Sequence, residues 1–244
     1  MSHEEPFFRA SRLSRVTRQS KTGDFGVRYS GLVALDMDGV LVPDPSTWER
    51  FHQILGTEKE RQRNMELFYR GEIDYETWAR LDASLWREMS VKPVLGYLSR
   101  VPLVEGAHQL VDEMHRLGVA TAIVSTGIEI VAEEISKRLG IDFFVANRVI
   151  VRRGVFAGEV LVRCPFDGKG LALRRLGENL KIPRRRRAAV GNDSNDVSMF
   201  KEATFSIAFN PISEDAEKAA SVSIRSETLY EVTDLLRQFF LSPG

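Results

Sequence analysis

Two aspartates separated by one residue, Asp36 and Asp38, stand directly after the short apolar run at residues 31–35. Such a run is typical of a buried parallel strand, and ligands of open α/β sheets bind where those strands end. Side chains two positions apart at a strand end can take separate roles on one substrate. On a phosphate monoester, one carboxylate would attack phosphorus and the other would protonate the leaving oxygen. Asp36 and Asp38 are therefore candidate catalytic residues.

Phosphate chemistry also needs positive charge, because two carboxylates alone would repel the substrate. Lys169 begins a predicted helix directly after Asp167-Gly168 and can supply part of this charge. Mg²⁺ would supply the rest, since this hard cation prefers oxygen ligands. Its candidate ligands are Asp36, Asp38 and an oxygen of Asn192 or Asp196 in the polar loop 191–196. Asp193 is an alternative third ligand, and the residues alone leave that choice open.

A third polar loop, Ser125-Thr126-Gly127, follows the apolar run at residues 119–124. The hydroxyl of Ser125 and the backbone amides at the start of the next predicted helix can bind phosphate oxygens. Together with Lys169, this loop forms the predicted phosphate site.

The elements that must position these loops alternate between strands and helices. The predicted strands cover residues 31–35, 119–124, 188–190, 204–209 and 221–224, and short strands within 143–162 turn at residues 153–154 and 157–158. The predicted helices cover residues 106–117, 128–139, 169–180, 213–220 and 227–240. This alternation predicts a Rossmann-like α/β fold with three layers, a doubly wound parallel sheet between helices.

Three segments complete the predicted domain organisation. Residues 43–102 are helical in pattern and rich in aromatic side chains, which predicts a helical cap inserted into the catalytic core. The core then comprises residues 31–42 and 103–244. Residues 1–30 carry four arginines spaced three apart and few apolar residues, and they are interpreted as a flexible basic arm.

The overall composition excludes several classes of protein. Lys and Arg number 34, equal to Asp and Glu, so no net charge favours nucleic acid, and binding to it is not expected. The single cysteine, Cys164, cannot form an internal disulfide, and four scattered histidines give no zinc-type cluster. No run approaches the roughly 18 apolar residues of a membrane span. These features predict a soluble, cytoplasmic protein without a membrane partner; they leave the oligomeric state open.

The ordered set of motifs is more specific than any one of them. Asp36-Met-Asp-Gly-Val, Ser125-Thr-Gly, Lys169-Gly and Gly191-Asn-Asp-Ser-Asn-Asp occur in that order. In these motifs the chain resembles the haloacid dehalogenase superfamily, and within it the phosphoserine-phosphatase-like branch with a helical cap of the C1 type. The resemblance implies that Asp36 forms an aspartyl-phosphate and that Asp38 acts as acid and then as base. It also implies that Ser125 binds phosphoryl oxygens, that Lys169 balances charge, and that the 191–196 loop holds Mg²⁺.

Three positions depart from the pattern of that branch. Asn192 stands where the family has an aspartate, Pro45 where phosphoserine phosphatases have a glutamate, and Asp82 where the alignment places a cap arginine. Phosphoserine is therefore not expected as the substrate. Arg80, together with Arg70 and Glu49, is an alternative recognition set.

Two further residues, Tyr75 and Asn195, are candidates for substrate recognition. The main hypothesis is a magnesium-dependent phosphatase for a small phosphorylated metabolite. A phosphotransferase is one alternative. Another is a catalytically weakened scaffold that binds a partner through its basic arm.

Overall fold

The structure, a computed structural model, describes residues 8–10, 29–44 and 46–242. The predicted basic arm therefore lies largely outside the described residues, as does Pro45. Within the arm, Phe8 is buried and strand β1 (Arg9–Ala10) pairs antiparallel with strand β4 (Phe143–Arg152). This short stretch of the arm thus packs on the edge of the sheet.

The sheet is centred on β2 (Gly31–Leu35), which pairs in parallel with β3 (Val119–Ile128) on one side and β6 (Arg187–Gly191) on the other. Parallel pairing continues through β4 at one end and through β7 (Phe205–Phe209) and β8 (Val222–Ile224) at the other. The resulting order is β1-β4-β3-β2-β6-β7-β8. The predicted parallel α/β sheet is confirmed.

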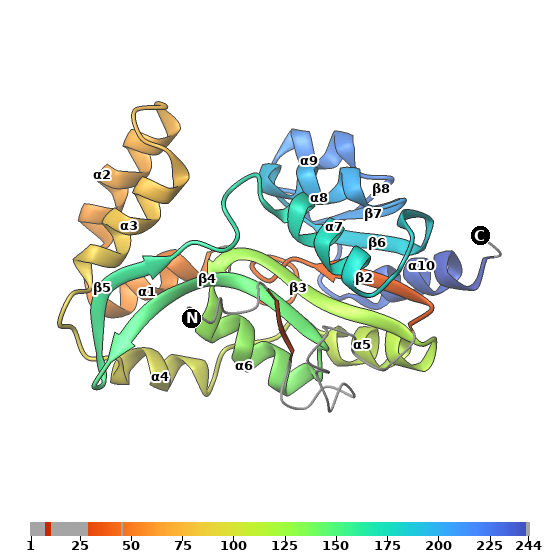
Figure 1. The fold of residues 1–244 in the computed structure, drawn as a ribbon, viewed down its shortest axis with the longest axis horizontal. Coiled ribbons are helices and arrows are strands. Elements are labelled where there is room, and N and C mark those ends of the chain that lie inside the picture. The colour runs from red at the N-terminus through yellow and green to blue at the C-terminus, as the bar shows by residue number, and fades with distance from the viewer. Residues whose placement is uncertain (1–7, 11–28, 45, 243–244) are drawn as a thin grey trace, which may run out of the picture.

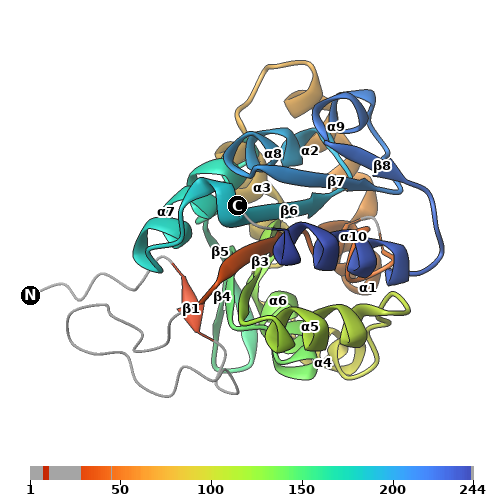
Figure 2. The same ribbon diagram turned by 90° about the vertical axis from the view of Figure 1, so that its right-hand side faces the viewer.

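Helices cover both faces of this sheet, as Figures 1 and 2 show. Val33 and Leu35 of β2 belong to the core cluster under one face, and Leu32 and Ala34 belong to the cluster under the other. The first cluster includes α5 (Ala107–Arg116), α6 (Glu129–Leu139) and α10 (Tyr230–Leu241). The second includes α7 (Lys169–Asn179), α8 (Val197–Glu202) and α9 (Glu214–Ala219). Alternate side chains of a strand point to opposite faces, which explains this division.

Between β2 and α5 the chain forms a group of helices that extends beyond the end of the sheet (Figure 1). These are α1 (Thr47–Leu55), α2 (Glu58–Tyr69), α3 (Tyr75–Leu85) and α4 (Lys92–Leu98). The side chains of Ser46 and Asp74 cap α1 and α3 by accepting from backbone amides of their first turns. The helical pattern predicted for residues 43–102 therefore corresponds to four helices.

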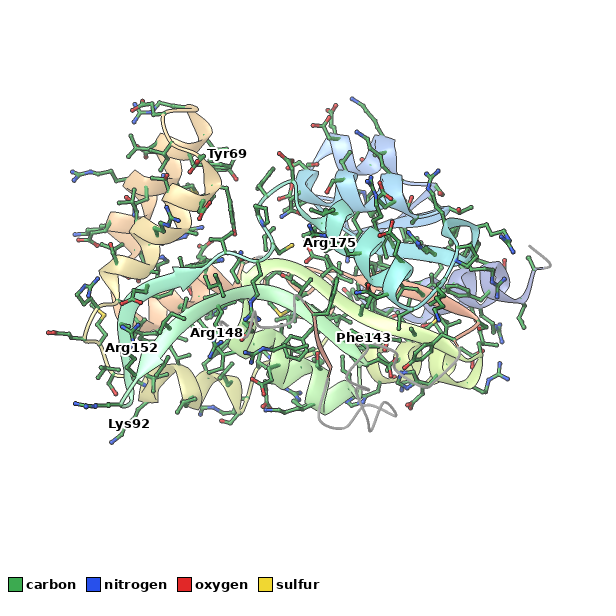
Figure 3. All side chains as sticks on the ribbon, in the orientation of Figure 1. Tyr69, Lys92, Phe143, Arg148, Arg152 and Arg175 are labelled. Atoms are coloured by element: carbon green, nitrogen blue, oxygen red, sulfur yellow. The ribbon has the colours of Figure 1, made fainter. Side chains whose placement is uncertain are left out.

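Strand β4 continues past the sheet and forms a hairpin with β5 (Val155–Leu161). The turn at Arg153-Gly154 has φ values of 52° and 80°, a left-handed pair that suits a two-residue hairpin. The second predicted turn, at residues 157–158, is wrong. Gly158 is instead part of a bulge inside β5, where the register against β4 shifts. Figure 3 labels Arg152 near the outer end of this hairpin.

The hairpin is tied to the segment that follows α3. The amide of Glu88 donates to the carbonyl of Phe156 over 2.8 Å, and the amide of Phe156 donates to the carbonyl of Met89 over 2.9 Å. The helices and the hairpin are thus joined by backbone hydrogen bonds.

Two 3-10 turns, η1 (Arg184–Arg186) and η2 (Ser194–Asp196), flank β6. In the described part of the chain, no helix combines the length and the apolar character that crossing a membrane would require.

Candidate active site

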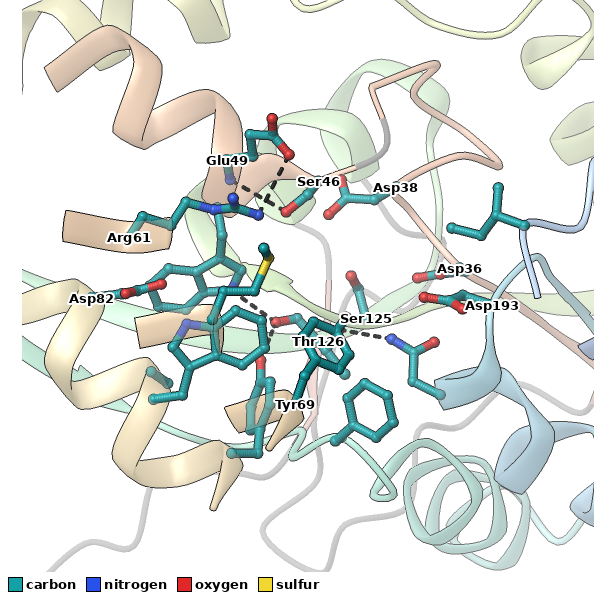
Figure 4. Close-up of a pocket in the computed structure, with 18 of the residues that line it drawn as sticks. Asp36, Asp38, Ser46, Glu49, Arg61, Tyr69, Asp82, Ser125, Thr126 and Asp193 are labelled. Atoms are coloured by element: carbon teal, nitrogen blue, oxygen red, sulfur yellow. Dashed lines mark hydrogen bonds and ion pairs between the residues drawn. The ribbon is translucent and has the colours of Figure 1, made fainter. Parts of the chain in front are cut away.

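A cavity of about 220 Å³ lies between the carboxyl ends of the central strands and helices α1 to α3 (Figure 4). Ten of the residues singled out in the sequence line it: Asp36, Asp38, Glu49, Tyr75, Asp82, Ser125, Thr126, Asn192, Asp193 and Asn195. Lys169, Asp196 and Gly127 lie beside this lining, whereas Arg80 lies elsewhere. The polar loops after β2 and β6 therefore meet the residues 125–127, because neighbouring parallel strands end at the same edge of the sheet. These three residues were predicted as a loop after a strand at 119–124, but β3 continues through them to Ile128 as a bulge.

Asp36 and Lys169 form a buried ion pair at the base of the cavity. The Nζ atom of Lys169 lies 2.8 Å from Oδ2 of Asp36 and 2.7 Å from Oδ1 of Asp196. Lys169 is fully buried at the first position of α7, so its ammonium group depends on these carboxylates. The other oxygen of Asp36 accepts from the amide of Met37 over 2.7 Å. One carboxylate oxygen of Asp36 is thus held by an ammonium group and the other by an amide.

Asp38 is held from the start of α1. Thr47 donates its backbone amide and its hydroxyl to Oδ2 of Asp38, and both distances are 3.0 Å. The Oδ1 atom of Asp38 is buried and has no hydrogen-bond partner among the described residues. This oxygen is therefore available to a group that enters the cavity.

The loop Ser125-Thr126-Gly127 leaves the regular pairing between β3 and β4. Val124 pairs with Val145 but Ile128 pairs with Asn147, so β3 carries extra residues at this point. The amide of Gly127 donates to Oγ of Ser125 over 2.9 Å. On the other side of the loop, Asn195 donates to the hydroxyl oxygen of Thr126 over 3.2 Å. The bulge thus brings a serine hydroxyl and backbone groups into the site.

Burial raises the pKa values of both aspartates. Burial, and after it the Asp196 carboxylate, raise the pKa of Asp36 to about 8, although Lys169 acts in the opposite direction. Burial raises the pKa of Asp38 to about 6, against the lowering effect of the hydrogen bonds from Thr47. Both aspartates would be more readily ionised if a further cation were bound beside them.

The donor atoms at the site fit a magnesium ion. Asp36, Asp38 and Asn192 all line the cavity and offer hard oxygen atoms. The amide side chain of Asn192 lies against Gly39, where an added Cβ would come within 2.1 Å of its nitrogen. This packing puts Asn192 beside the loop that carries Asp38. Among the described residues, no three His, Cys, Asp or Glu side chains are grouped to hold a metal ion, so the candidate set here is two aspartates and an asparagine.

Asp196 is less suited to a metal than predicted. One of its oxygens bonds to Lys169, and the other accepts from the amides of Asn192 and Asp193 over 2.8 and 3.0 Å. Both oxygens are thus used in holding Lys169 and the turn of the 191–196 loop. Asp193 lines the cavity, and its Oδ1 atom accepts from the amide of Ser194. Asn192 is therefore the strongest candidate for the third ligand, and Asp193 is the alternative.

The far half of the cavity carries a charged pair from α1 and α2. Glu49 and Arg61 both line it, and Nη2 of Arg61 lies 3.4 Å from Oε2 of Glu49 (Figure 4). The Nε atom of Arg61 is buried without a hydrogen-bond partner among the described residues. Of these two residues, Glu49 was singled out in the sequence and Arg61 was missed.

The structure does not support Arg80 or Arg70 as recognition residues. Arg80 is exposed and pairs with Glu76 one turn earlier on α3, and Arg70 is exposed and pairs with Glu72. Neither side chain lines the cavity. Arg80 lies on the face of α3 that points to solvent, and Arg70 follows the last residue of α2.

Asp82, which stands where the alignment placed a cap arginine, connects three helices. It accepts from Asn64 of α2 over 2.8 Å, and its other oxygen lies 3.3 Å from the ring nitrogen Nε2 of His52 in α1. Asp82 thus hydrogen-bonds to α2 and lies close to the buried imidazole ring of His52 in α1. Asp82 forms part of the cavity wall, but its carboxylate serves mainly to hold α1, α2 and α3 together.

The rest of the cavity wall is largely apolar, and only part of it was predicted from the sequence. Helices α1, α2 and α3 contribute aromatic rings, and the segment before α7 contributes Phe166. The aromatic lining consists of Trp48, Tyr69, Tyr75, Trp78 and Phe166. Figure 3 shows Tyr69 near the end of α2, on the side facing α7. Aromatic residues are common in helix cores, so spacing alone could not separate these from the buried Trp86.

Comparison with known proteins agrees with this arrangement. The model of the haloacid dehalogenase-like hydrolase family matches residues 33–201, a span that contains the three strand-end loops and Lys169. The chain belongs to the haloacid dehalogenase-like hydrolases.

Within this family, the hydrolase belongs to the phosphoserine-phosphatase-like branch. It is 29% identical over 209 residues to the phosphoserine phosphatase of Methanocaldococcus jannaschii, a match that covers 84% of this chain and 97% of that protein. It is 31% identical over 143 residues to the phosphoserine phosphatase of Campylobacter jejuni subsp. doylei, covering 57% of this chain and 68% of that protein. The predicted family and branch are confirmed.

Solved structures give the same result. A phospho-aspartyl intermediate analogue of phosphoserine phosphatase superimposes with a TM-score of 0.76 at 28% identity, covering 86% of this hydrolase and all of that chain. A substrate-bound phosphoserine phosphatase complex gives a TM-score of 0.75 at 28% identity, covering 84% and 98% of the two chains. With the relatives above, these matches confirm the predicted enzyme class, a phosphoric monoester hydrolase.

Proposed function

We propose that this hydrolase is a magnesium-dependent phosphatase that acts on a small phosphate monoester and carries the phosphoryl group on Asp36. The observation that carries the proposal is the ion pair of Lys169 with Asp36, 2.8 Å long, at the base of a cavity also lined by Asp38 and Ser125. A carboxylate held this way is oriented as a nucleophile toward a phosphate in the cavity. The phospho-aspartyl analogue solved for a similar phosphatase supports the same chemistry here.

In the first half of the reaction, a carboxylate oxygen of Asp36 attacks phosphorus and the bond to the leaving oxygen breaks. Asp38 gives its proton to that oxygen, so the leaving group departs as an alcohol. Its raised pKa of about 6 leaves a larger share of Asp38 protonated near neutrality than an ordinary aspartate would have. Thr47 keeps the Asp38 carboxyl group in one orientation through two hydrogen bonds.

In the second half, Asp38 accepts a proton from a water molecule, which attacks phosphorus. The bond between Asp36 and phosphorus then breaks and inorganic phosphate leaves. Ser125 binds a phosphoryl oxygen through its hydroxyl group, and Lys169 offsets negative charge behind Asp36. Mg²⁺ bound by Asp36, Asp38 and Asn192 would add positive charge next to the phosphoryl oxygens.

For the substrate, we propose a phosphorylated amino acid, with phosphoserine as the first candidate, so that the leaving group is the amino acid itself. The sequence argued against phosphoserine because Pro45 and Asp82 stand where the alignment places a glutamate and a cap arginine. Glu49 and Arg61 instead offer one negative and one positive group, 3.4 Å apart, in the far half of the cavity. These charges suit the amino and carboxyl groups of a small amino acid. Phosphoserine is also the substrate in the names of the relatives.

The nucleophile is tested with Asp36→Asn, which preserves the size of the side chain. We expect turnover of p-nitrophenyl phosphate with Mg²⁺ to fall by at least about a thousandfold, since no alternative nucleophile replaces the carboxylate. Circular dichroism and thermal unfolding show whether the fold is kept. Activity close to wild type in a folded variant would rule out Asp36 as the nucleophile.

The substrate is tested with Arg61→Gln, using Arg80→Gln as the matched control on a neighbouring helix. Arg61→Gln should lower kcat/KM for phosphoserine by about tenfold to a hundredfold, because a charge-assisted hydrogen bond is lost, with little effect on p-nitrophenyl phosphate. Arg80→Gln should change neither, since Arg80 is outside the cavity. Equal effects of the two variants, or no turnover of phosphoserine by wild type, would exclude the assigned leaving group.

A further inference from the structure

The backbone carbonyl of Thr126 accepts hydrogen bonds from three side chains in three different elements. Trp48 in α1 donates through Nε1 over 3.0 Å, Tyr75 at the start of α3 donates through its hydroxyl over 2.8 Å, and Asn147 in β4 donates through Nδ2 over 2.8 Å. A carbonyl oxygen in a regular strand usually accepts one such bond from its neighbour. Two helices of the 43–102 segment and one sheet strand therefore meet at a single atom of the Ser125 loop.

The bulge in β3 explains why this carbonyl needs side-chain donors. Between the pairs Val124 with Val145 and Ile128 with Asn147, the residues 125–127 of β3 stand against Ala146 alone in β4, so the regular ladder of backbone hydrogen bonds is interrupted. A buried carbonyl without a partner is costly, so side chains replace the missing donors of the ladder. Asn147 is fully buried and also accepts from the amides of Arg163 and Cys164, which fixes its own orientation.

The carbonyl of Thr126 and the amide of Gly127 belong to the same peptide unit. Because that unit is planar, the direction of the carbonyl also sets the direction of the amide. The amide of Gly127 donates to Oγ of Ser125 over 2.9 Å. The donors to Thr126 therefore control the orientation of a group that lies directly beside the catalytic carboxylates.

We propose that Trp48 and Tyr75 are positioning residues that couple the docking of α1 and α3 to the geometry of the phosphate-binding loop. When both helices are docked, their side chains hold the peptide between Thr126 and Gly127 in one orientation. When the helices move away, the carbonyl loses two of its three donors and the loop loosens. This inference rests on the proposed function for the role of the loop in binding phosphate.

The same contacts revise the role expected for Tyr75. Its ring lines the cavity, but its hydroxyl donates to Thr126 and accepts from Asn147 over 3.0 Å. The hydroxyl is therefore engaged with the loop instead of being available to a substrate. Trp48 is arranged similarly, since its indole lines the cavity while its N–H bonds to Thr126.

The test compares Tyr75→Phe with Tyr230→Phe. Tyr230 also donates one hydroxyl hydrogen bond, to Glu105, but lies on α10 away from the cavity. For p-nitrophenyl phosphate, Tyr75→Phe should lower kcat by about tenfold and weaken inhibition by orthovanadate by a similar factor, while KM changes less than about twofold. Trp48→Phe should act in the same direction, and it serves as the second variant if Tyr75→Phe does not fold.

A measurement that does not depend on enzyme turnover distinguishes this inference from the proposed function. Hydrogen exchange at residues 125–128, measured without substrate, should be faster in Tyr75→Phe than in wild type and unchanged in Tyr230→Phe. If Tyr75→Phe and Trp48→Phe both match Tyr230→Phe in kcat, vanadate inhibition and exchange, the coupling is overturned. If wild type shows no turnover that depends on Asp36 but exchange still rises in Tyr75→Phe, the proposed function fails and the coupling stands.

Discussion

Thr47 donates both its backbone amide and its hydroxyl to the same oxygen of Asp38, at 3.0 Å each. Its hydroxyl oxygen also accepts from the amide of Ile128 over 3.3 Å, just beyond the Ser125 loop. A single threonine at the start of α1 thus links the proposed acid to the end of β3. Through Thr47, helix α1 therefore helps to orient Asp38.

Replacing Thr47 by valine should therefore reduce catalysis without removing any proposed catalytic group. The variant keeps the amide hydrogen bond to Asp38 but loses the hydroxyl, and a hydrogen bond to a charged group contributes about 1.5–3 kcal/mol. We expect kcat for p-nitrophenyl phosphate to fall by about tenfold or more in Thr47→Val. Thr47→Ser retains the hydroxyl and should recover most of the activity. A serine variant as impaired as the valine variant would argue against this role of the hydroxyl.

Lys169→Met should destabilise the protein as well as inactivate it. The substitution would leave Asp36 and Asp196 buried without their shared ammonium group. Removing one partner of a buried ion pair costs about 3–5 kcal/mol, which can be measured by urea unfolding in the presence of EDTA. Lys218→Met is the control, because Lys218 forms an exposed pair with Glu214 and should change stability by less than about 1 kcal/mol. Similar losses of unfolding free energy in Lys169→Met and Lys218→Met would contradict the assigned role of Lys169.

Adding a methyl group at Gly127 should disturb the site directly. A Cβ there would lie 2.7 Å from Oγ1 of Thr47 and 2.9 Å from Oδ2 of Asp38. Gly127→Ala should lower kcat by about tenfold or more and cost about 1–3 kcal/mol of stability, as overpacking usually does. Gly96→Ala meets nothing within 4 Å, lies inside α4, and should stabilise the protein by about 0.5–1 kcal/mol. Full activity in Gly127→Ala would show that the loop tolerates displacement.

Asn192→Asp should strengthen magnesium binding. The change replaces a neutral amide beside the Asp36 and Asp38 loop by a carboxylate, which a hard divalent cation prefers. We expect the Mg²⁺ concentration that gives half-maximal activity to fall by about tenfold in Asn192→Asp. Asp193→Asn should leave it nearly unchanged if Asn192 is the third ligand. If Asp193→Asn strongly raised the Mg²⁺ concentration for half-maximal activity, and Asn192→Asp left it unchanged, the third ligand would be Asp193.

Local sequence pattern was sufficient to predict the core elements. Apolar runs followed by polar loops identified β2, β3 and β6, and helical periodicity identified α5 to α7 within a few residues. The periodicity of apolar residues and the polar residues at strand ends are local properties, so a single sequence is sufficient to detect them. For the same reason the pattern led to Asp36, Asp38, Ser125 and Asn192, which the structure brings to one cavity.

The tertiary structure decided what the helices between β2 and α5 contribute. Arg61 and Arg80 both lie on polar helices, and the sequence pattern led to Arg80 and not to Arg61. Packing of α2 and α3 turns Arg61 into the cavity and Arg80 to solvent. The same packing uses Asp82 to bind the helices together. Which face of a helix is buried depends on its neighbours, and that information is not local.

The sequence by itself thus determined the α/β core and the chemical groups at its strand ends. Only the folded chain decided which side chains surround those groups: Thr47 at Asp38, the Glu49 and Arg61 pair, and the three donors to the carbonyl of Thr126. The physical reason is the distance along the chain. Tyr75 and Asn147 are separated from Thr126 by 51 and 21 residues, so only long-range packing can bring their hydrogen bonds to that atom.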